Sequence, residues 1–467
     1  MLTSSPATDP SIEERVEHVR SAARQDILRD VDDRVTQLRR LRHFLVEHED
    51  LICGALATDL GKSSFEAHTT EIGFTITEID HALEHIRKWT SERKVSLPLH
   101  FRPGKARIAP EPLGSVLIIA PWNYPLMLLL APLVPAIAAG NTAVLKPSEV
   151  APATAAMLAD QLPRHLDQRV VQVVNGGVEE TTELLAMPFD HIFYTGNGNV
   201  GRIVMRAAAE HLTPVTLELG GKSPAIVTSS ARIDVAARRI AFGKFLNAGQ
   251  SCVAPDYVLV PEVLHDRFVA KLVETIHTFF GDDPSSSPDY GRIVNERHHD
   301  RLVALLDAGG FTTTAIGGDH DRAERYFAPT VVTGVATDAA VMDDEIFGPI
   351  LPIVSYRKLD QAIEFVCDRP KPLALYAFGE DHDQIEHVVD HTSSGGVTVN
   401  HTMVQLTIDE LPFGGVGASG MGAYHGEQGF RTFSHDKSIL IPPSRPDPGL
   451  LYPPYGELAK RILRKVL

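Results

Sequence analysis

Cysteine is scarce in this chain. Three cysteines occur among 467 residues, and this small, odd number argues against the dense disulfide framework of secreted mini-domains. It suits a reducing compartment, so we expect a cytoplasmic protein. The first ten residues contain neither a basic segment nor an apolar segment behind it. No signal peptide is therefore predicted.

Long apolar runs and an excess of positive charge are missing as well. The most apolar stretch, residues 126–140, is interrupted by Pro132 and Pro135 and is shorter than the ~20 residues of a membrane-spanning helix. We interpret it as a buried helix and expect no membrane anchor. The formal net charge of −16 argues against nucleic acid as a partner. The 21 histidines form no cluster with cysteine at ligand spacing, so no metal site is predicted.

The apolar residues that are present follow two repeating patterns. Steps of three and four residues predict helices over residues 12–60 and 66–89. Short apolar runs then alternate with helical segments, which predicts a doubly wound α/β domain, and a second such series runs from 225 to 399. Between the helices and the first strand, residues 91–108 are basic and extended. The strands expected in the first series are 114–120, 142–145, 170–174, 191–195 and 214–219.

Polar and glycine residues follow these predicted strands. In such sheets a ligand binds outside the carboxyl ends of the strands. A glycine turn at residues 196–201 matches the dinucleotide pattern of a turn between strand and helix. That pattern calls for an acid about twenty residues later, which would make Glu218 a ribose ligand. Alternatively Lys146 and Glu149 bind the ribose, or Ser148 simply caps a helix whose first turn contains Glu149.

Cys252 lies among small and turn-forming residues, just before a predicted strand at 258–260. Such a turn suits a nucleophilic thiolate, which needs a partly exposed and polarising setting; a buried structural thiol is the alternative. Cys53 and Cys367 fall in helical patterns and are interpreted as structural. Asn123 lies in a turn bracketed by prolines, where its amide is suited to stabilise an oxyanion; a simple turn-forming asparagine is the alternative.

Together these stretches resemble the NAD(P)-dependent aldehyde dehydrogenase superfamily. Residues 252–257 and 419–426 resemble its class 3 branch, and residues 426–437 resemble the bacterial coniferyl aldehyde type. The resemblance implies an α/β fold with a Rossmann-type cofactor domain, an α/β catalytic domain and a small bridging or oligomerisation arm. The motifs that carry it are 121–125, 146–149, 196–201, 218–224, 249–252, 345–349 and 412–415. The implied domains are 1–217 for the cofactor, interrupted near 92–108 by a bridging segment, 218–405 for catalysis, 406–435 returning to the cofactor domain, and 436–467 as bridging strand and tail.

The resemblance also assigns roles to residues. It makes Cys252 the nucleophile, Glu218 the general base and Asn123 the oxyanion donor. The implied cofactor is NAD, with NADP as an alternative, and the implied partner is a small aldehyde, aromatic or aliphatic, bound by a homodimer. The implied cofactor contacts are Trp122, Lys146, Glu149, Gly196, Asn197, Gly201, Leu219, Glu345 and Phe347. Departures from the family are Asn197 and Gly198 in the glycine turn, and His401 where many relatives have an acid.

The reaction expected from these residues proceeds through sulfur. Cys252 attacks the aldehyde carbonyl, Asn123 and the backbone N–H of Cys252 hold the oxyanion, and hydride loss to the nicotinamide leaves a thioester. Glu218 then activates water to release the acid. A cofactor-binding protein without chemistry and a relative that transfers the acyl group to coenzyme A are the alternatives. The presence of Glu218 favours water as the acceptor.

Overall fold

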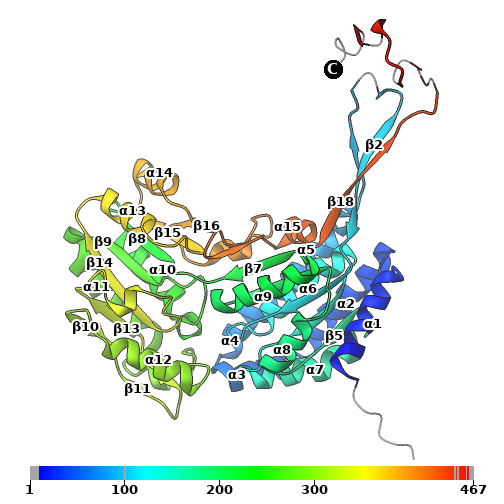
Figure 1. Cartoon of the computed structure of the whole chain (residues 1–467). Coiled ribbons are helices and arrows are strands. Elements are labelled where there is room, and N and C mark those ends of the chain that lie inside the picture. Colours follow the sequence, from blue (N-terminus) through cyan, green and yellow to red (C-terminus); the bar gives the residue numbers. More distant parts are fainter. Residues whose placement is uncertain are drawn as a thin grey trace, which may run out of the picture.

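The computed structural model describes residues 10–98 and 101–445, together with 447, 449, 452–458, 460 and 461. The expected loose arm before Pro10 lies outside these residues. Two α/β lobes lie side by side, and a narrow arm of strands projects from one of them (Figure 1).

Helices at the amino end cover one side of the first lobe. Ser11 caps the first of them, because its hydroxyl accepts a hydrogen bond from Glu14 N while the Glu14 carboxylate accepts one from Ser11 N. The apolar positions that predicted helices in this region, such as Leu38 and Phe44, are buried. The helices are α1 (Ile12–Arg24), α2 (Val31–Glu47), α3 (Glu49–Leu60), α4 (Ser64–Ala67), a π-helical turn (His68–Ile72) and α5 (Gly73–Trp89).

The first sheet has the strand order β17-β7-β6-β3-β4-β5. The strands β3 to β7 are parallel, and short β17 (Gly420–Met421) pairs with β7 in the antiparallel sense. The chain order reverses beside β3, which has β4 on one side and β6 on the other, so this is a switch point where ligands bind. The elements are β3 (Ser115–Ile119), α6 (Met127–Ala139), β4 (Thr142–Lys146), α7 (Pro152–His165), β5 (Val171–Val173), α8 (Val178–Leu185), β6 (His191–Gly196), α9 (Gly198–His211) and β7 (Val215–Leu219).

The apolar stretch with two prolines forms α6, and each of its residues is buried. It packs against α2, α5 and the strands β3 and β4, which confirms the prediction of a buried helix. Among the described residues no helix combines the length and the apolar character that crossing a membrane requires.

The second sheet has the order β10-β13-β14-β9-β8-β15-β16, parallel except for the edge strand β10. The predicted alternation of strands and helices between residues 225 and 399 is confirmed. A hairpin of β11 (His320–Asp321) and β12 (Tyr326–Phe327) stands beside this sheet. The other elements are β8 (Pro224–Val227), α10 (Ile233–Phe245), β9 (Tyr257–Pro261), α11 (His265–Phe280), α12 (Glu296–Asp307), β10 (Thr313–Ile316), β13 (Thr330–Thr333), β14 (Ile350–Tyr356), α13 (Leu359–Cys367), β15 (Ala374–Phe378), α14 (His382–His391) and β16 (Gly396–Val399).

The projecting arm is a three-stranded antiparallel sheet. Strands β1 (Arg93–Val95), β2 (Lys105–Pro112) and β18 (Ser434–Ile441) form it in the order β1-β2-β18. Helix α15 (Gly426–Thr432) precedes β18 and packs on α6. The extended conformation expected for residues 91–108 is therefore correct over β1 and β2, whereas the oligomerisation role and the domain division stay predictions.

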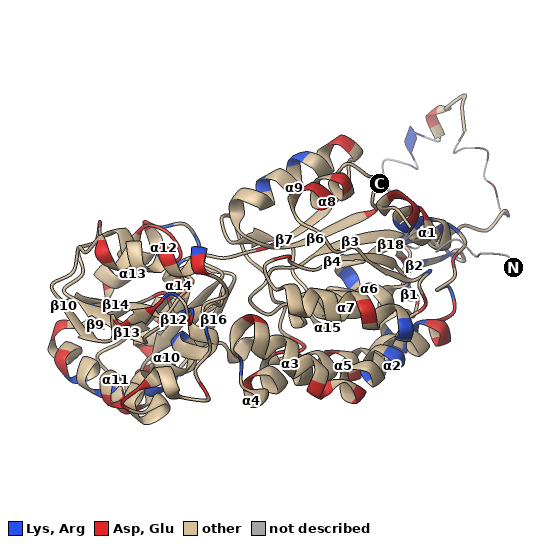
Figure 2. Cartoon of the chain, turned by 90° about the horizontal axis from the view of Figure 1, so that it is seen from below, with Lys and Arg blue, Asp and Glu red and all other residues tan. Residues whose placement is uncertain are grey.

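A short link joins the two sheets. Strand β7 ends at Leu219 and β8 begins at Pro224, so only residues 220–223 separate them, and the view in Figure 2 shows the two lobes meeting at this side. The segment after β3 and the link after β7 lie beside the segments that lead into β9 and β14, since Asn123 Nδ2 donates to Gln250 O and Gly220 packs against Glu345. Acidic residues are spread over both lobes (Figure 2), in agreement with the negative net charge.

Candidate active site

The turn that contains Cys252 is fixed by its backbone. The short 3₁₀ segment before it has Asn247 and Ala248 at φ values of 50° and 51°, in the left-handed region that such residues rarely adopt. Gly249 follows at φ 76°, and a Cβ atom there would lie 2.3 Å from the carbonyl oxygen of Gly348. Only glycine fits this position, because the conformation and the close approach both exclude a side chain.

Gln250 ties this turn to the second lobe. Its side chain is buried, and its Nε2 donates to the carbonyl oxygens of Asn247 and Arg292, each at 2.9 Å. Its Oε1 accepts a hydrogen bond from Val294 N at 2.9 Å. Since all of these partners are backbone groups, Gln250 positions the chain two residues before Cys252.

Asn123 connects the first lobe to the same turn. It lies just after β3, is 2 % exposed, and its Nδ2 donates to Gln250 O at 3.1 Å. Its own carbonyl oxygen accepts from Asn247 Nδ2 at 2.8 Å. An amide nitrogen carries two donor hydrogens, so one remains for a substrate oxygen. The predicted oxyanion donor and the predicted nucleophile are therefore brought together.

A buried ion pair supports Asn123 from behind. Lys62 Nζ lies 2.5 Å from Glu71 Oε1, with both side chains fully buried, and it donates to Asn123 O at 3.0 Å. The other Glu71 oxygen accepts from Leu126 N at 2.8 Å and Met127 N at 3.2 Å. Sequence reasoning missed this pair, because Lys62 falls between the two predicted helices and Glu71 in one of them, where a charge is expected on a solvated face.

Glu218 is buried near the end of β7 and is 3 % exposed. Neither carboxylate oxygen has a hydrogen-bond partner among the described residues. Desolvation raises the pKa of Glu218 well above its ordinary value. A buried carboxylate without a structural partner and with a raised pKa is suited to accept a proton near neutral pH.

Cys252 is partly exposed, as expected, but its surroundings do not favour the thiolate. Burial of the sulfur raises the pKa of the Cys252 thiol, and the charges of Glu345 and Glu218 raise it further. The charges of both carboxylates therefore act against formation of the thiolate. The groups that favour the thiolate are therefore limited to backbone N–H donors.

Glu345 and Phe347 lie before β14, beside the cysteine turn. Asp256 holds this segment, because it accepts from Ile346 N at 3.2 Å and from Lys222 Nζ at 2.6 Å. Burial, and then the Asp256 charge, raises the pKa of Glu345 to about 8. Glu345 Oε1 has no hydrogen-bond partner among the described residues, so it is available to accept a hydrogen bond from a ligand.

Two aromatic rings meet across the lobes. The Trp122 and Phe347 ring centroids lie 5.3 Å apart at an interplanar angle of 82°, an edge-to-face arrangement that is favourable for such pairs. Trp122 follows β3, and Phe347 precedes β14 with a left-handed φ of 47°. The structure therefore brings together residues that the sequence places 225 positions apart.

Lys146 and Glu149 lie at the end of the neighbouring strand β4. The Lys146 side chain is 2 % exposed and its Nζ lies 3.7 Å from Glu149 Oε2. Lys146 Nζ donates to Pro147 O at 2.8 Å, which leaves further donor capacity on the ammonium group. Burial lowers the pKa of Lys146. At this strand end Lys146 offers a hydrogen-bond donor and the half-exposed Glu149 carboxylate offers an acceptor. Such a pair is suited to bind two neighbouring hydroxyl groups.

The glycine turn after β6 is tightly packed. A Cβ at Gly196 would lie 2.2 Å from the Tyr194 hydroxyl, and one at Gly201 would lie 3.0 Å from Leu219 Cδ2. Asn197 caps α9, because its Oδ1 accepts from the backbone N–H groups of residues 199 and 200, both at 3.0 Å. The turn therefore has the close packing that a dinucleotide site needs, while Asn197 already satisfies two of the helix's amino-terminal donors.

Metal ligation is not indicated by the geometry. Over the described part of the chain no group of three or more His, Cys, Asp or Glu side chains is arranged to hold a metal ion. His401, the other departure noted in the sequence, is half-buried and its Nδ1 accepts from Thr402 N at 2.9 Å. Cys53 is half-buried against the core and Cys367 is exposed, with its Sγ donating to a carbonyl oxygen at 3.1 Å.

Comparisons with known proteins agree with this arrangement. The model of the aldehyde dehydrogenase family matches residues 2–439. The chain is 48 % identical over 434 residues to 4,4'-diaponeurosporen-aldehyde dehydrogenase of Staphylococcus aureus, covering 93 % of this chain and 94 % of that protein. It is 50 % identical over 448 residues to aldehyde dehydrogenase family 3 member A2 of the mouse, covering 96 % and 92 %.

A solved structure of a Staphylococcus aureus aldehyde dehydrogenase in a substrate-bound state superposes with a TM-score of 0.95 at 46 % identity, covering 98 % of this chain and all of that chain. The resemblance to the class 3 branch is thus confirmed, and the likeness to the coniferyl type stays a prediction. This chain belongs to the aldehyde dehydrogenase family.

Proposed function

We propose that the protein oxidises an aldehyde to the carboxylic acid with NAD(P)+, using Cys252 as nucleophile. The observation that carries this proposal is the meeting of three groups where the lobes join. Asn123 is hydrogen-bonded to the cysteine turn at 3.1 Å, and Glu218 is electrostatically coupled to Cys252. Each is suited to a different step of the same reaction.

In the first step Cys252 adds to the aldehyde carbon and forms a thiohemiacetal. The second N–H of the Asn123 amide and the Cys252 backbone N–H hold the oxyanion, and one such donor typically contributes a factor of about 10²–10³ in rate. A bound nicotinamide supplies the acceptor for the hydride that the carbon loses. Cys252 then carries a thioester, Glu218 takes a proton from water, and that water releases the acid.

The cofactor is held by this chain's strand-end residues. Lys146 and Glu149 bind the adenosine ribose, Glu345 binds the nicotinamide ribose, and Trp122 with Phe347 borders the ring. Gly196, Asn197, Gly201 and Leu219 form the surface that the pyrophosphate approaches. The half-exposed Glu149 carboxylate disfavours a 2′-phosphate by charge repulsion, so NAD is the preferred cofactor. NADP is also accepted in our proposal, since a canine relative is named as NADP-preferring.

The substrate in this proposal is an apolar aldehyde, either aromatic, such as coniferyl aldehyde, or aliphatic with a medium or long chain. One relative is named for 4,4'-diaponeurosporen-aldehyde. We further propose a cytoplasmic homodimer, because the canine relative is named as dimeric. Strand β18, at the edge of the arm, has its Leu440 and Ile441 side chains exposed, and a second copy would cover them.

Replacement of single cysteines tests the proposed chemistry. We expect Cys252→Ala to abolish NADH formation from a panel of aromatic and aliphatic aldehydes. Cys367→Ala is the matched control, because this exposed thiol lies on α13, and it should retain full activity. NADH formation by the Cys252→Ala protein at the rate of the control would contradict the assignment of the nucleophile.

A further inference from the structure

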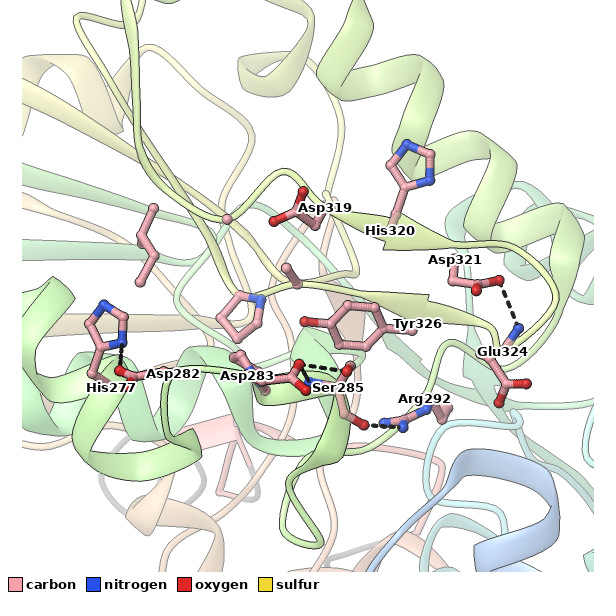
Figure 3. A pocket seen from close by; sticks show the side chains of 15 residues that line it. His277, Asp282, Asp283, Ser285, Arg292, Asp319, His320, Asp321, Glu324 and Tyr326 are labelled. Carbon is pink, nitrogen blue, oxygen red and sulfur yellow. Dashed lines mark hydrogen bonds and ion pairs between the residues drawn. The ribbon is translucent and has the colours of Figure 1, made fainter.

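A cleft lined by acidic side chains lies on the second lobe, outside the residues assigned to aldehyde oxidation. Its volume is about 490 Å³, and its walls are the end of α11 with residues 282–285 and the hairpin of β11 and β12 (Figure 3). The hairpin stands beside the large sheet rather than within it. The cleft is therefore a surface feature of this lobe alone.

The lining has a strong excess of negative charge. Its single arginine, Arg292, already donates to the carbonyl oxygens of Ser285, Tyr290 and Gly291, and His277 lies 3.3 Å from the Asp282 carboxylate. The Asp319 side chain has no hydrogen bond or ion pair with any described residue. The acids that line the cleft are Asp282, Asp283, Asp319, Asp321 and Glu324.

A buried tyrosine lies between these acids. Tyr326 is 7 % exposed, and its hydroxyl has no hydrogen-bond partner among the described residues. Figure 3 shows this hydroxyl pointing into the cleft between Asp283 and Asp319. Burial, followed by those two charges, raises the pKa of Tyr326 to about 12, so the hydroxyl stays neutral and can both accept and donate a hydrogen bond.

The acids occupy two ends of the cleft. Asp282 and Asp283 lie on one side of the Tyr326 ring, and Asp321 and Glu324 on the other (Figure 3). A compact metal ion needs several ligands around one point, and no described group of three such side chains meets that need. Separated carboxylates with an aromatic ring between them fit an elongated cation whose charges are joined by methylene groups.

We propose that this cleft binds an organic polycation of the alkyl polyamine class. Ammonium groups pair with the acids at the two ends, one ammonium N–H is donated to the Tyr326 hydroxyl, and the methylene chain spans the space between them. The Arg292 guanidinium lies over the Tyr326 ring, 5.5 Å from its centroid, so the hydroxyl rather than the ring face is the contact offered to the ligand. This binding site is independent of the aldehyde site. The two sites are nevertheless close in space, because Arg292, which lines the cleft, also supplies the carbonyl oxygen that accepts from Gln250 Nε2 at 2.9 Å.

Calorimetric titration with spermidine tests the proposal on the full-length protein. We expect saturable binding of one spermidine per chain at low salt and at 0.15 M salt, with weaker affinity at the higher salt because exposed charges are screened. Tyr326→Phe keeps the ring and removes the hydroxyl, and it should weaken binding about tenfold, the size of one hydrogen bond to a charged group. Asp319→Asn should weaken binding by a similar factor.

Asp338→Asn is the matched control, since Asp338 is an exposed acid outside the cleft, and it should bind as tightly as the unmodified protein. Equal spermidine affinity in the Asp319→Asn, Tyr326→Phe and control proteins would overturn the proposal, as would displacement of spermidine by an equal concentration of Mg²⁺. Because Cys252→Ala should bind spermidine normally, a failure here is distinguishable from a failure of the proposed aldehyde chemistry.

Discussion

The buried pair of Lys62 and Glu71 offers a quantitative test of how the first lobe supports the site. In Lys62→Met a side chain of similar length loses its charge, and the Glu71 carboxylate stays fully buried without its cation. Breaking a buried ion pair in this way typically costs about 3–5 kcal/mol. The Glu71 carboxylate is not left without any partner, because it still accepts hydrogen bonds from two backbone N–H groups at 2.8 and 3.2 Å. We therefore expect the free energy of unfolding to fall by about 3 kcal/mol, the lower end of this range.

Lys62→Met should also slow the proposed reaction. Lys62 donates to Asn123 O at 3.0 Å, and Asn123 donates in turn to the cysteine turn. Because a displacement of about 1 Å in a reacting geometry can cost up to about a hundredfold in rate, kcat should fall clearly, while KM for the cofactor should change little. Steady-state NADH formation with a single aldehyde measures both constants.

Denaturant unfolding followed by tryptophan fluorescence measures the stability. The two tryptophans of the chain, Trp89 and Trp122, lie at the end of α5 and beside Asn123, so both report on the lobe that contains the pair. Lys271→Met is the matched control. Lys271 lies 2.6 Å from Glu274 but on an exposed face of α11, and such a pair contributes at most about 1 kcal/mol.

The double variant Lys62→Met/Glu71→Gln completes the test. It removes the unpaired charge while an amide oxygen remains to accept from the backbone of α6, so it should be more stable than Lys62→Met alone. If Lys62→Met lowered stability no more than Lys271→Met, or if the double variant were less stable than Lys62→Met, the reasoning from an uncompensated buried charge would be refuted.

Two further predictions concern the carboxylates near Cys252. Glu218→Gln should give one rapid burst of NADH per active site followed by slow turnover, because water is no longer activated; rapid-mixing absorbance would show this, and a normal steady-state rate would reject the base. Glu345, with its pKa raised from 4.5 to about 8, binds a proton more tightly in the folded chain. Its contribution to stability is therefore full below about pH 4.5 and declines by about 1.4 kcal/mol per pH unit as the pH rises to 8. Glu345→Gln should flatten this decline in urea titrations at pH 6 and 8, and an unchanged slope would contradict the assignment.

The sequence predicted the elements around the site because their signals are local. Runs such as residues 116–119 are apolar throughout, which is typical of a strand buried on both faces, and the residues that follow each run lie at the ends of neighbouring parallel strands. Asn123, Lys146 and Gly196 could therefore be placed at one edge of a sheet before any coordinates were known. The resemblance to a family, and not the spacing, decided between the two roles open to Glu218.

The supporting contacts could not be predicted in this way. Gln250 and Lys62 act through hydrogen bonds to backbone groups that lie far away in the sequence. Neither a repeating apolar pattern nor a motif indicates such partners. The electrostatic environment of Cys252 was also beyond reach, because a pKa depends on burial and on charges from other elements. Local pattern thus indicated which residues matter, and tertiary packing determined how they are held.

Several unpartnered polar atoms lie where the two lobes join. A buried donor or acceptor without a partner typically costs about 1–3 kcal/mol, and folded proteins keep few of them. Among the described residues, Asn123 Oδ1, both Glu218 oxygens, Ser251 Oγ and Glu345 Oε1 are buried without a hydrogen-bond partner. A Cβ at Gly220 would lie 2.0 Å from Glu345 Oε2, so a side chain in the link between the sheets would displace this carboxylate. In our proposal these unsatisfied groups are the ones that meet the substrate and the cofactor, which supply the hydrogen-bond partners that the chain itself leaves out.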